Sequence, residues 1–166
     1  MNESPDSVNE TSEIVKKEPE SVTFDYSSMD NETATFLQEK ANNIVRIKAM
    51  SMLAVAKELK EAQGVLSNNK TGTFLVWCKS VGYEKSTVYD YIRTLDYIVR
   101  NSDNIENLES IKPSLLFAIS KPSAPAELQK AVLDGDITSH KEYQEALKAK
   151  AEAEQEAKKA IEAKEP

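Results

Sequence analysis

The stretch from Phe74 to Arg93 reads FLVWCKSVGYEKSTVYDYIR, and it has the layout of a helix, a turn and a second helix. Gly82 anchors this layout, because glycine lets a chain turn with a positive φ at little steric cost. Before Gly82, four apolar residues fall at i, i+3, i+4 and i+7 and therefore share one face of a short helix; they are Phe74, Trp77, Cys78 and Val81. Cys78 is expected where the two helices cross closely, because a small side chain is needed there.

The second helix is expected to start near Lys85 to Thr87 and to run from Ser86 through Val99. Its inward set comprises Tyr83, Val88, Tyr91 and Ile92, continued by Leu95, Ile98 and Val99. Its outward set comprises Lys85, Ser86, Tyr89, Asp90 and Arg93, a mixed polar face with two cations. Such a face is typical of a helix that reads the major groove of DNA. The alternative is an αα-hairpin whose outer face is only solvated.

Candidate DNA contacts follow from this register. Thr71 or Thr73, in or next to the loop of residues 66 to 72, is expected to cap the first helix, whose free N–H groups would meet a phosphate. The residues predicted to bind DNA are Lys70, Thr73, Lys79, Lys85, Ser86, Thr87, Tyr89 and Arg93. Of these, Lys70, Thr73 and Lys79 would hold the backbone, and the others would meet base edges or phosphates. Glu84 and Asp90 are unfavourable against DNA unless they accept from a cytosine amino group or orient Arg93.

A long amphipathic helix is predicted from about Thr33 to Gln63, with Gly64 as its C-cap. One apolar stripe repeats at four-and-three spacing and comprises Val45, Ala49, Met52, Ala56 and Leu59. A second edge comprises Ile44, Ile47, Met50 and Ser51. The helix is longer than the small domain needs, so its N-terminal half is expected to pack against a second copy of the chain.

The remaining segments complete an expected all-α fold. Residues 1–30 predict a disordered acidic tail, because Glu, Ser, Asn and Pro alternate there without a period. Residues 31–137 predict a helical domain that contains the helix-turn-helix at 73–99 and two short, proline-broken helices. Residues 138–166 are rich in Ala, Glu and Lys and predict a solvated C-terminal helix, capped by Thr138 or Ser139.

The net charge of -7 would count against nucleic-acid binding if it were evenly spread. It is not. Residues 1–40 hold ten acidic and three basic residues, whereas residues 41–100 hold nine basic and five acidic residues. The predicted helix-turn-helix therefore lies in the basic third of the chain.

Several other classes of protein are disfavoured by the composition. One cysteine allows no internal disulfide, no apolar run reaches membrane-spanning length, and the first residues are acidic, unlike a signal peptide. A cytoplasmic protein is therefore expected. Cys78 and the lone His140 have no partner group near them in sequence, and no zinc set or phosphate-binding glycine loop is present. We expect no enzyme activity, no cofactor and no metal site.

The region from Leu53 to Arg93 resembles an uncharacterised family of small proteins carried by phages, plasmids and integrated elements of low-GC bacteria. The resemblance rests on two blocks, one with Gly72, Phe74 and Trp77, the other with Ser86, Thr87, Val88 and Tyr91. The region from Leu115 to Leu147 is similar to the helices that follow the helix-turn-helix in ParB-type partition proteins. The nuclease-like N-terminal domain of that family has no counterpart here, so its activity is not carried over.

Both resemblances imply a DNA-binding domain. The function expected from the sequence is sequence-specific binding of duplex DNA by a homodimer, in transcriptional control or as an accessory to replication or maintenance of a mobile element. The alternative is a phage- or plasmid-encoded inhibitor or adaptor that binds a host protein through the acidic tail or the long helix.

Overall fold

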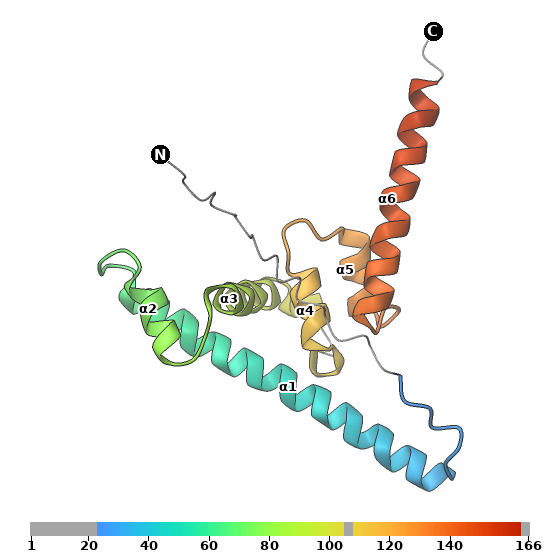
Figure 1. The fold of residues 1–166 in the computed structure, drawn as a ribbon, viewed down its shortest axis with the longest axis horizontal. Coiled ribbons are helices and arrows are strands. Elements are labelled where there is room, and N and C mark those ends of the chain that lie inside the picture. Colours follow the sequence, from blue (N-terminus) through green and yellow to red (C-terminus); the bar gives the residue numbers. More distant parts are fainter. Residues whose placement is uncertain (1–22, 105–107, 164–166) are drawn as a thin grey trace, which may run out of the picture.

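The computed structural model describes residues 23–104 and 108–163, and every regular element in these ranges is helical (Figure 1). The elements are α1 (Asn31–Leu66), α2 (Thr73–Ser80), α3 (Lys85–Arg100), the 3-10 helices η1 (Ser102–Asn104) and η2 (Leu108–Ser110), α4 (Pro113–Ile119), α5 (Ala126–Leu133) and α6 (His140–Glu162). The expected all-α class is confirmed for the described ranges. Most of the predicted acidic tail, residues 1–22, lies outside them.

The long helix α1 has 36 residues and is therefore about 54 Å long. Asp30 begins it, because its carboxylate accepts the N–H of Thr33 at 2.8 Å. The residues of α1 that are buried all lie in its second half: Ala49, Met52, Leu53, Ala56 and Leu59. The predicted stripe is confirmed from Ala49 to Leu59, and the predicted second edge of Ile44, Ile47 and Met50 is exposed.

The prediction that Gly64 caps α1 is wrong. The helix continues through Gly64 to Leu66, and Ser67 is its C-cap in a right-handed conformation. The Ser67 hydroxyl donates to the Gly64 carbonyl at 2.8 Å and so satisfies one of the last carbonyls of the helix. A glycine near a helix end permits a turn but does not impose one, and here a polar side chain three residues later supplies the cap.

Two clusters of buried side chains hold the helices together. The larger one joins the second half of α1 to α3, α4, α5 and the start of α6, with Leu115, Leu116 and Ile119 of α4 at its centre. The smaller one is formed by four residues from three helices: Leu59 of α1, Cys78 of α2, and Val88 and Ile92 of α3. The pair α2 and α3 is therefore fixed to the second half of α1.

The last helix, α6, begins in the core and then leaves it (Figure 1). Of the two predicted caps, Thr138 and Ser139, the cap is Ser139: its hydroxyl accepts the N–H of Glu142 at 3.2 Å, and the Glu142 carboxylate accepts the N–H groups of Thr138 and Ser139. Tyr143, one turn into the helix, is buried in the larger cluster. From Ala151 onward every described residue is exposed.

None of the helices in the described ranges is long and apolar enough to span a membrane.

Candidate nucleic-acid interface

The structure places α2 and α3 where the sequence predicted two helices, and the turn of residues 81–84 joins them. Gly82 has φ +94°, as its predicted role requires. The N–H of Tyr83 donates to the Cys78 carbonyl at 2.9 Å, and the N–H of Gly82 donates to the Lys79 carbonyl at 3.1 Å. This pair of bonds is the Schellman motif, which ends a helix and reverses the chain around a left-handed residue.

Cys78 lies at the crossing of α2 and α3, where a small side chain was predicted. It is fully buried against Leu59, Val88 and Ile92. Burial raises the pKa of the Cys78 thiol, so at neutral pH the group is a neutral packing element. The inward face of α3 is confirmed for Val88, Ile92, Leu95 and Ile98, which are all buried, with Tyr83 and Tyr91 half-buried beside them.

The predicted inward face of α2 is only partly correct. Trp77 keeps 37% of its surface exposed, and Val81 is exposed as well. Trp77 instead stacks on the half-buried Phe74, with ring centroids 6.5 Å apart. The apolar face of this eight-residue helix is wider than the surface that α1 and α3 offer to it. Val99 was also expected to be buried, but it lies in the last turn of α3, beyond the part that α1 and α2 cover, and is exposed.

Neither Thr71 nor Thr73 caps α2, contrary to the prediction. The N-cap position belongs to Gly72, with φ +88°, and no side chain in the described ranges bonds to the free N–H groups there. The Thr73 hydroxyl donates instead to the Lys70 carbonyl at 2.7 Å. Thr73 thus fixes the loop that carries Lys70 on the exposed side of α2.

The start of α3 presents a polar and aromatic face to solvent. Lys85, Ser86 and Tyr89 are exposed, and the Lys85 ammonium lies 6.0 Å from the centre of the Tyr89 ring. Thr87 is half-buried at the margin of this face. Exposed cations on the neighbouring elements extend the surface: Lys70 in the loop before α2 and Lys79 in α2 itself.

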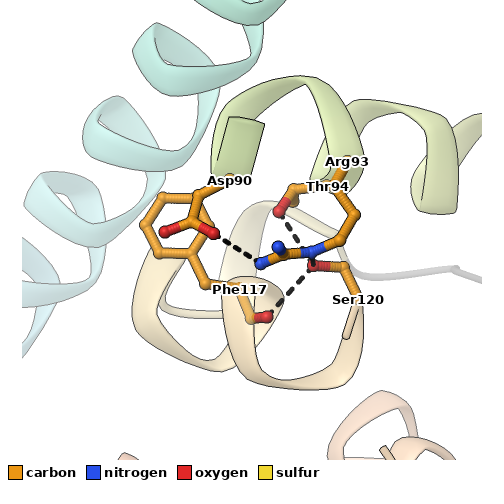
Figure 2. A network of polar contacts seen from close by, with 5 residues as sticks. All are labelled: Asp90, Arg93, Thr94, Phe117 and Ser120. Carbon is orange, nitrogen blue, oxygen red and sulfur yellow. Dashed lines mark hydrogen bonds and ion pairs between the residues drawn. The ribbon is translucent and has the colours of Figure 1, made fainter. Parts of the chain in front are cut away.

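Arg93 does not project into solvent, contrary to the prediction. Its guanidinium bonds the Asp90 carboxylate at 2.6 Å, and its Nε lies 3.5 Å from the Ser120 hydroxyl (Figure 2). The same hydroxyl donates to the Phe117 carbonyl at 3.0 Å and lies 3.0 Å from the buried Thr94 hydroxyl. Arg93 therefore joins α3 to the end of α4. Of the two partners considered for Asp90, Arg93 is the one to which the structure bonds it.

The charges around α3 are largely paired. Asp96 forms an ion pair with Lys60 of α1, and Asp90 forms one with Arg93. Within the part of the chain that the structure describes, Lys70, Lys79 and Lys85 take part in no ion pair, and neither does Glu84. The loop before α2, α2 itself and the first turn of α3 thus carry three exposed cations outside ion pairs, and Glu84 at the start of α3 is the one carboxylate there that is also outside an ion pair.

No local sequence pattern predicts the contacts between α3 and α4. Tyr91 stacks on Phe117 with ring centroids 5.7 Å apart, and Tyr83 meets the edge of Tyr91 at 5.9 Å. Burial, and then the neighbouring Tyr83, raise the pKa of Tyr91. These aromatic contacts and the Ser120 network hold α3 against α4.

Comparisons of the chain with protein-family models, with curated proteins and with solved structures found no match. The chemistry of the surface is therefore the basis for assigning a function. Uncommitted ammonium groups, hydroxyls and an exposed tyrosine suit a polyanion with hydrogen-bonding edges better than an apolar ligand.

Proposed function

We propose that this chain is a sequence-specific duplex DNA-binding protein in which α2 and α3 act as a helix-turn-helix. One observation carries the proposal: α3 is fixed by buried contacts on its inner side, while the side chains exposed on its first turns are Lys85, Ser86 and Tyr89. Helices that read the major groove contact base edges with the residues near their N-terminus. A rigid helix with such a face has the form that this recognition needs.

The proposed contacts differ in kind. Lys85, Ser86 and Tyr89 would meet base edges, with Thr87 beside them at the margin of the face. Lys70, in the loop before α2, and Lys79, in the last turn of α2, would meet phosphates. Arg93 would act as a positioning residue through α4, because its guanidinium is already bonded to Asp90 and Ser120. Thr73 would position the loop of Lys70 in the same way.

The proposed biological setting rests on the resemblance of residues 53–93 to proteins of phages, plasmids and integrated elements. A DNA-binding protein of such an element would control transcription or assist replication or maintenance. Which sequence it binds would distinguish an operator from a replication origin.

The experiment is a selection of bound sequences from a random duplex library with the full chain, followed by titration on the enriched site. Enrichment of one motif is expected. Lys85→Ala should then weaken binding by about 1–3 kcal/mol if the side chain reads a base edge. Lys79→Ala should lower the slope of log K against log salt by about one unit, as expected for a lost phosphate contact.

Lys148→Ala provides the matched control, since Lys148 is an exposed lysine on α6. It should bind as the wild type does. The proposal fails if no motif is enriched at physiological salt, or if a folded Lys85→Ala protein binds unchanged. In that case a protein-protein adaptor becomes the better assignment.

A further inference from the structure

The first half of α1 extends past the other α-helices (Figure 1), and η2 contacts it at Arg46. We call residues 31–48 the arm. None of its side chains is buried, and the burial of α1 begins only at Ala49. The arm is about 27 Å long at 1.5 Å per residue.

A second apolar stripe runs along the arm and one turn beyond it. It comprises Phe36, Ile44, Ile47 and Met50, which are exposed by 54, 57, 64 and 46%. At 3.6 residues per turn these side chains fall within about one third of the helix circumference. The side chains that enter the core, such as Met52 and Ala56, lie roughly half a turn away. The helix α1 is therefore apolar on two opposite sides, and only one of them is covered.

The composition of the arm makes an uncovered state unfavourable. Residues 42–47, NNIVRI, consist mainly of Asn and β-branched residues, which have low helix propensity. In proteins, helices draw most of their stability from the tertiary packing of an apolar face. Contiguous exposed apolar surface in a folded protein marks an interaction site. A partner that covers the stripe would therefore stabilise the helical form of the arm.

The charges beside the stripe fit a second copy of the chain. Glu39 and Arg46 lie seven residues apart, two turns along the same flank. If two arms align antiparallel about a two-fold axis near residues 42 and 43, Glu39 of each copy faces Arg46 of the other. The same register places Ile47 and Ile44 of each copy within one residue of Leu37 and of the aliphatic stem of Lys40 in the other. The arm is therefore self-complementary in charge along this flank.

We propose that the arm is a dimerisation element that pairs antiparallel with the arm of a second copy. This inference does not depend on DNA binding. The interface is short, with about five large side chains from each copy, and so belongs at the lower end of specific interfaces. A dissociation constant on the order of micromolar is expected for such a contact. Arg46 lies 3.7 Å from Glu109 of its own chain, but both side chains are more than half exposed, so this pair competes weakly.

The first test is sedimentation equilibrium of the full chain without DNA. The wild type should approach twice its 18.5 kDa at 100 μM, and Ile44→Glu combined with Ile47→Glu should weaken association at least tenfold. Val65→Glu is the matched control, because Val65 is an exposed apolar residue at the other end of the same helix, and it should leave association unchanged. Dilution of the wild type through the dissociation range should also lower the helical circular dichroism signal, because the arm of the monomer has no packing partner and loses helical structure.

The second test is a charge exchange across the proposed axis. Glu39→Arg alone and Arg46→Glu alone should each weaken association several-fold, because each places like charges opposite one another. The double variant should restore association to near the wild-type value, an outcome that self-pairing requires and that no other partner would produce. Glu109→Gln should have no effect. A wild type that stays monomeric at 100 μM, or a dimer indifferent to the changes at Ile44 and Ile47, would overturn the proposal.

Discussion

At the scale of single residues, Trp77 shows how far a side chain can depart from the position that its spacing predicts. Because it stacks on Phe74 and keeps 37% of its surface exposed, Trp77→Ala should cost about 1–2 kcal/mol, less than the 3–5 kcal/mol of a fully buried aromatic. Urea unfolding measures this cost. Trp77 is the only tryptophan, so acrylamide should quench the fluorescence of the folded protein efficiently. Tryptophan fluorescence that acrylamide does not quench, together with a loss of more than 3 kcal/mol of stability in Trp77→Ala, would contradict the observed exposure of Trp77.

Arg93 illustrates the opposite case. It was predicted to be exposed to solvent, and the structure bonds it to Asp90 and Ser120. Its side chain is 28% exposed and bonds two partners, so Arg93→Ala should destabilise the protein by about 1–2 kcal/mol. Arg100→Ala, in the exposed last turn of the same helix, should change stability by less than about 0.5 kcal/mol. Thermal unfolding of the two variants side by side measures the difference. Equal stabilities would show that the contact with α4 contributes nothing.

At the scale of helices and turns, two glycines near helix ends should respond to alanine in opposite ways. Gly82 has φ +94°, which an L side chain tolerates poorly, so Gly82→Ala should cost about 1–2 kcal/mol. Gly64 lies inside α1 with ordinary helical geometry, and no described atom lies within 4 Å of an added Cβ. Gly64→Ala should therefore stabilise the protein by about 0.5 kcal/mol. The midpoints of urea unfolding show whether each substitution stabilises or destabilises the protein. A Gly82→Ala protein more stable than the wild type would contradict the left-handed conformation of the turn.

The start of α6 should make part of the stability depend on pH. The pKa of Glu142 is lowered, first because its carboxylate accepts the N–H of Thr138. A lowered pKa contributes stability above the pKa of the unfolded chain, and this contribution is lost as pH falls through the folded value. Thermal midpoints between pH 7 and pH 3 should therefore decline less steeply for Glu142→Gln than for the wild type. Identical pH profiles would exclude a role for this carboxylate.

The helices show what could be predicted from sequence and what could not. The turn at Gly82 and the cap of α6 at Thr138 or Ser139 were predicted, because each depends on residues within about one turn of itself. The packing of Cys78 was predicted from the register of the two helices that the turn joins. The tether of Arg93 was missed, because Ser120 lies 27 residues later in the chain. Periodicity shows which side chains share a face of a helix. It does not show which faces a neighbouring helix will cover, and for that reason Trp77 and Val99 were misplaced.

At the scale of the whole molecule, the two exposed surfaces belong to different parts of α1 and its neighbours. The uncommitted lysines surround the turn between α2 and α3, which pack on the second half of α1. The apolar stripe lies on the first half, beyond the core. A substitution in one surface therefore leaves the residues of the other surface in place. DNA binding and self-association can be measured as separate properties of one folded chain.

The charge distribution of the whole chain gives the last prediction. Residues 1–22 hold six acidic and two basic residues, so their removal changes the net charge from -7 to -3 while leaving every lysine around the turn in place. Less negative charge means less repulsion of a polyanion, and the gain should fade as salt screens it, because the Debye length falls from about 30 Å at 0.01 M to about 10 Å at 0.1 M. Residues 23–166 should thus bind a non-specific duplex more tightly than the full chain at low ionic strength and about equally at 0.2 M. Fluorescence anisotropy on one labelled duplex across a salt series measures both. Weaker binding after truncation would mean that residues 1–22 contact DNA or support the surface that does.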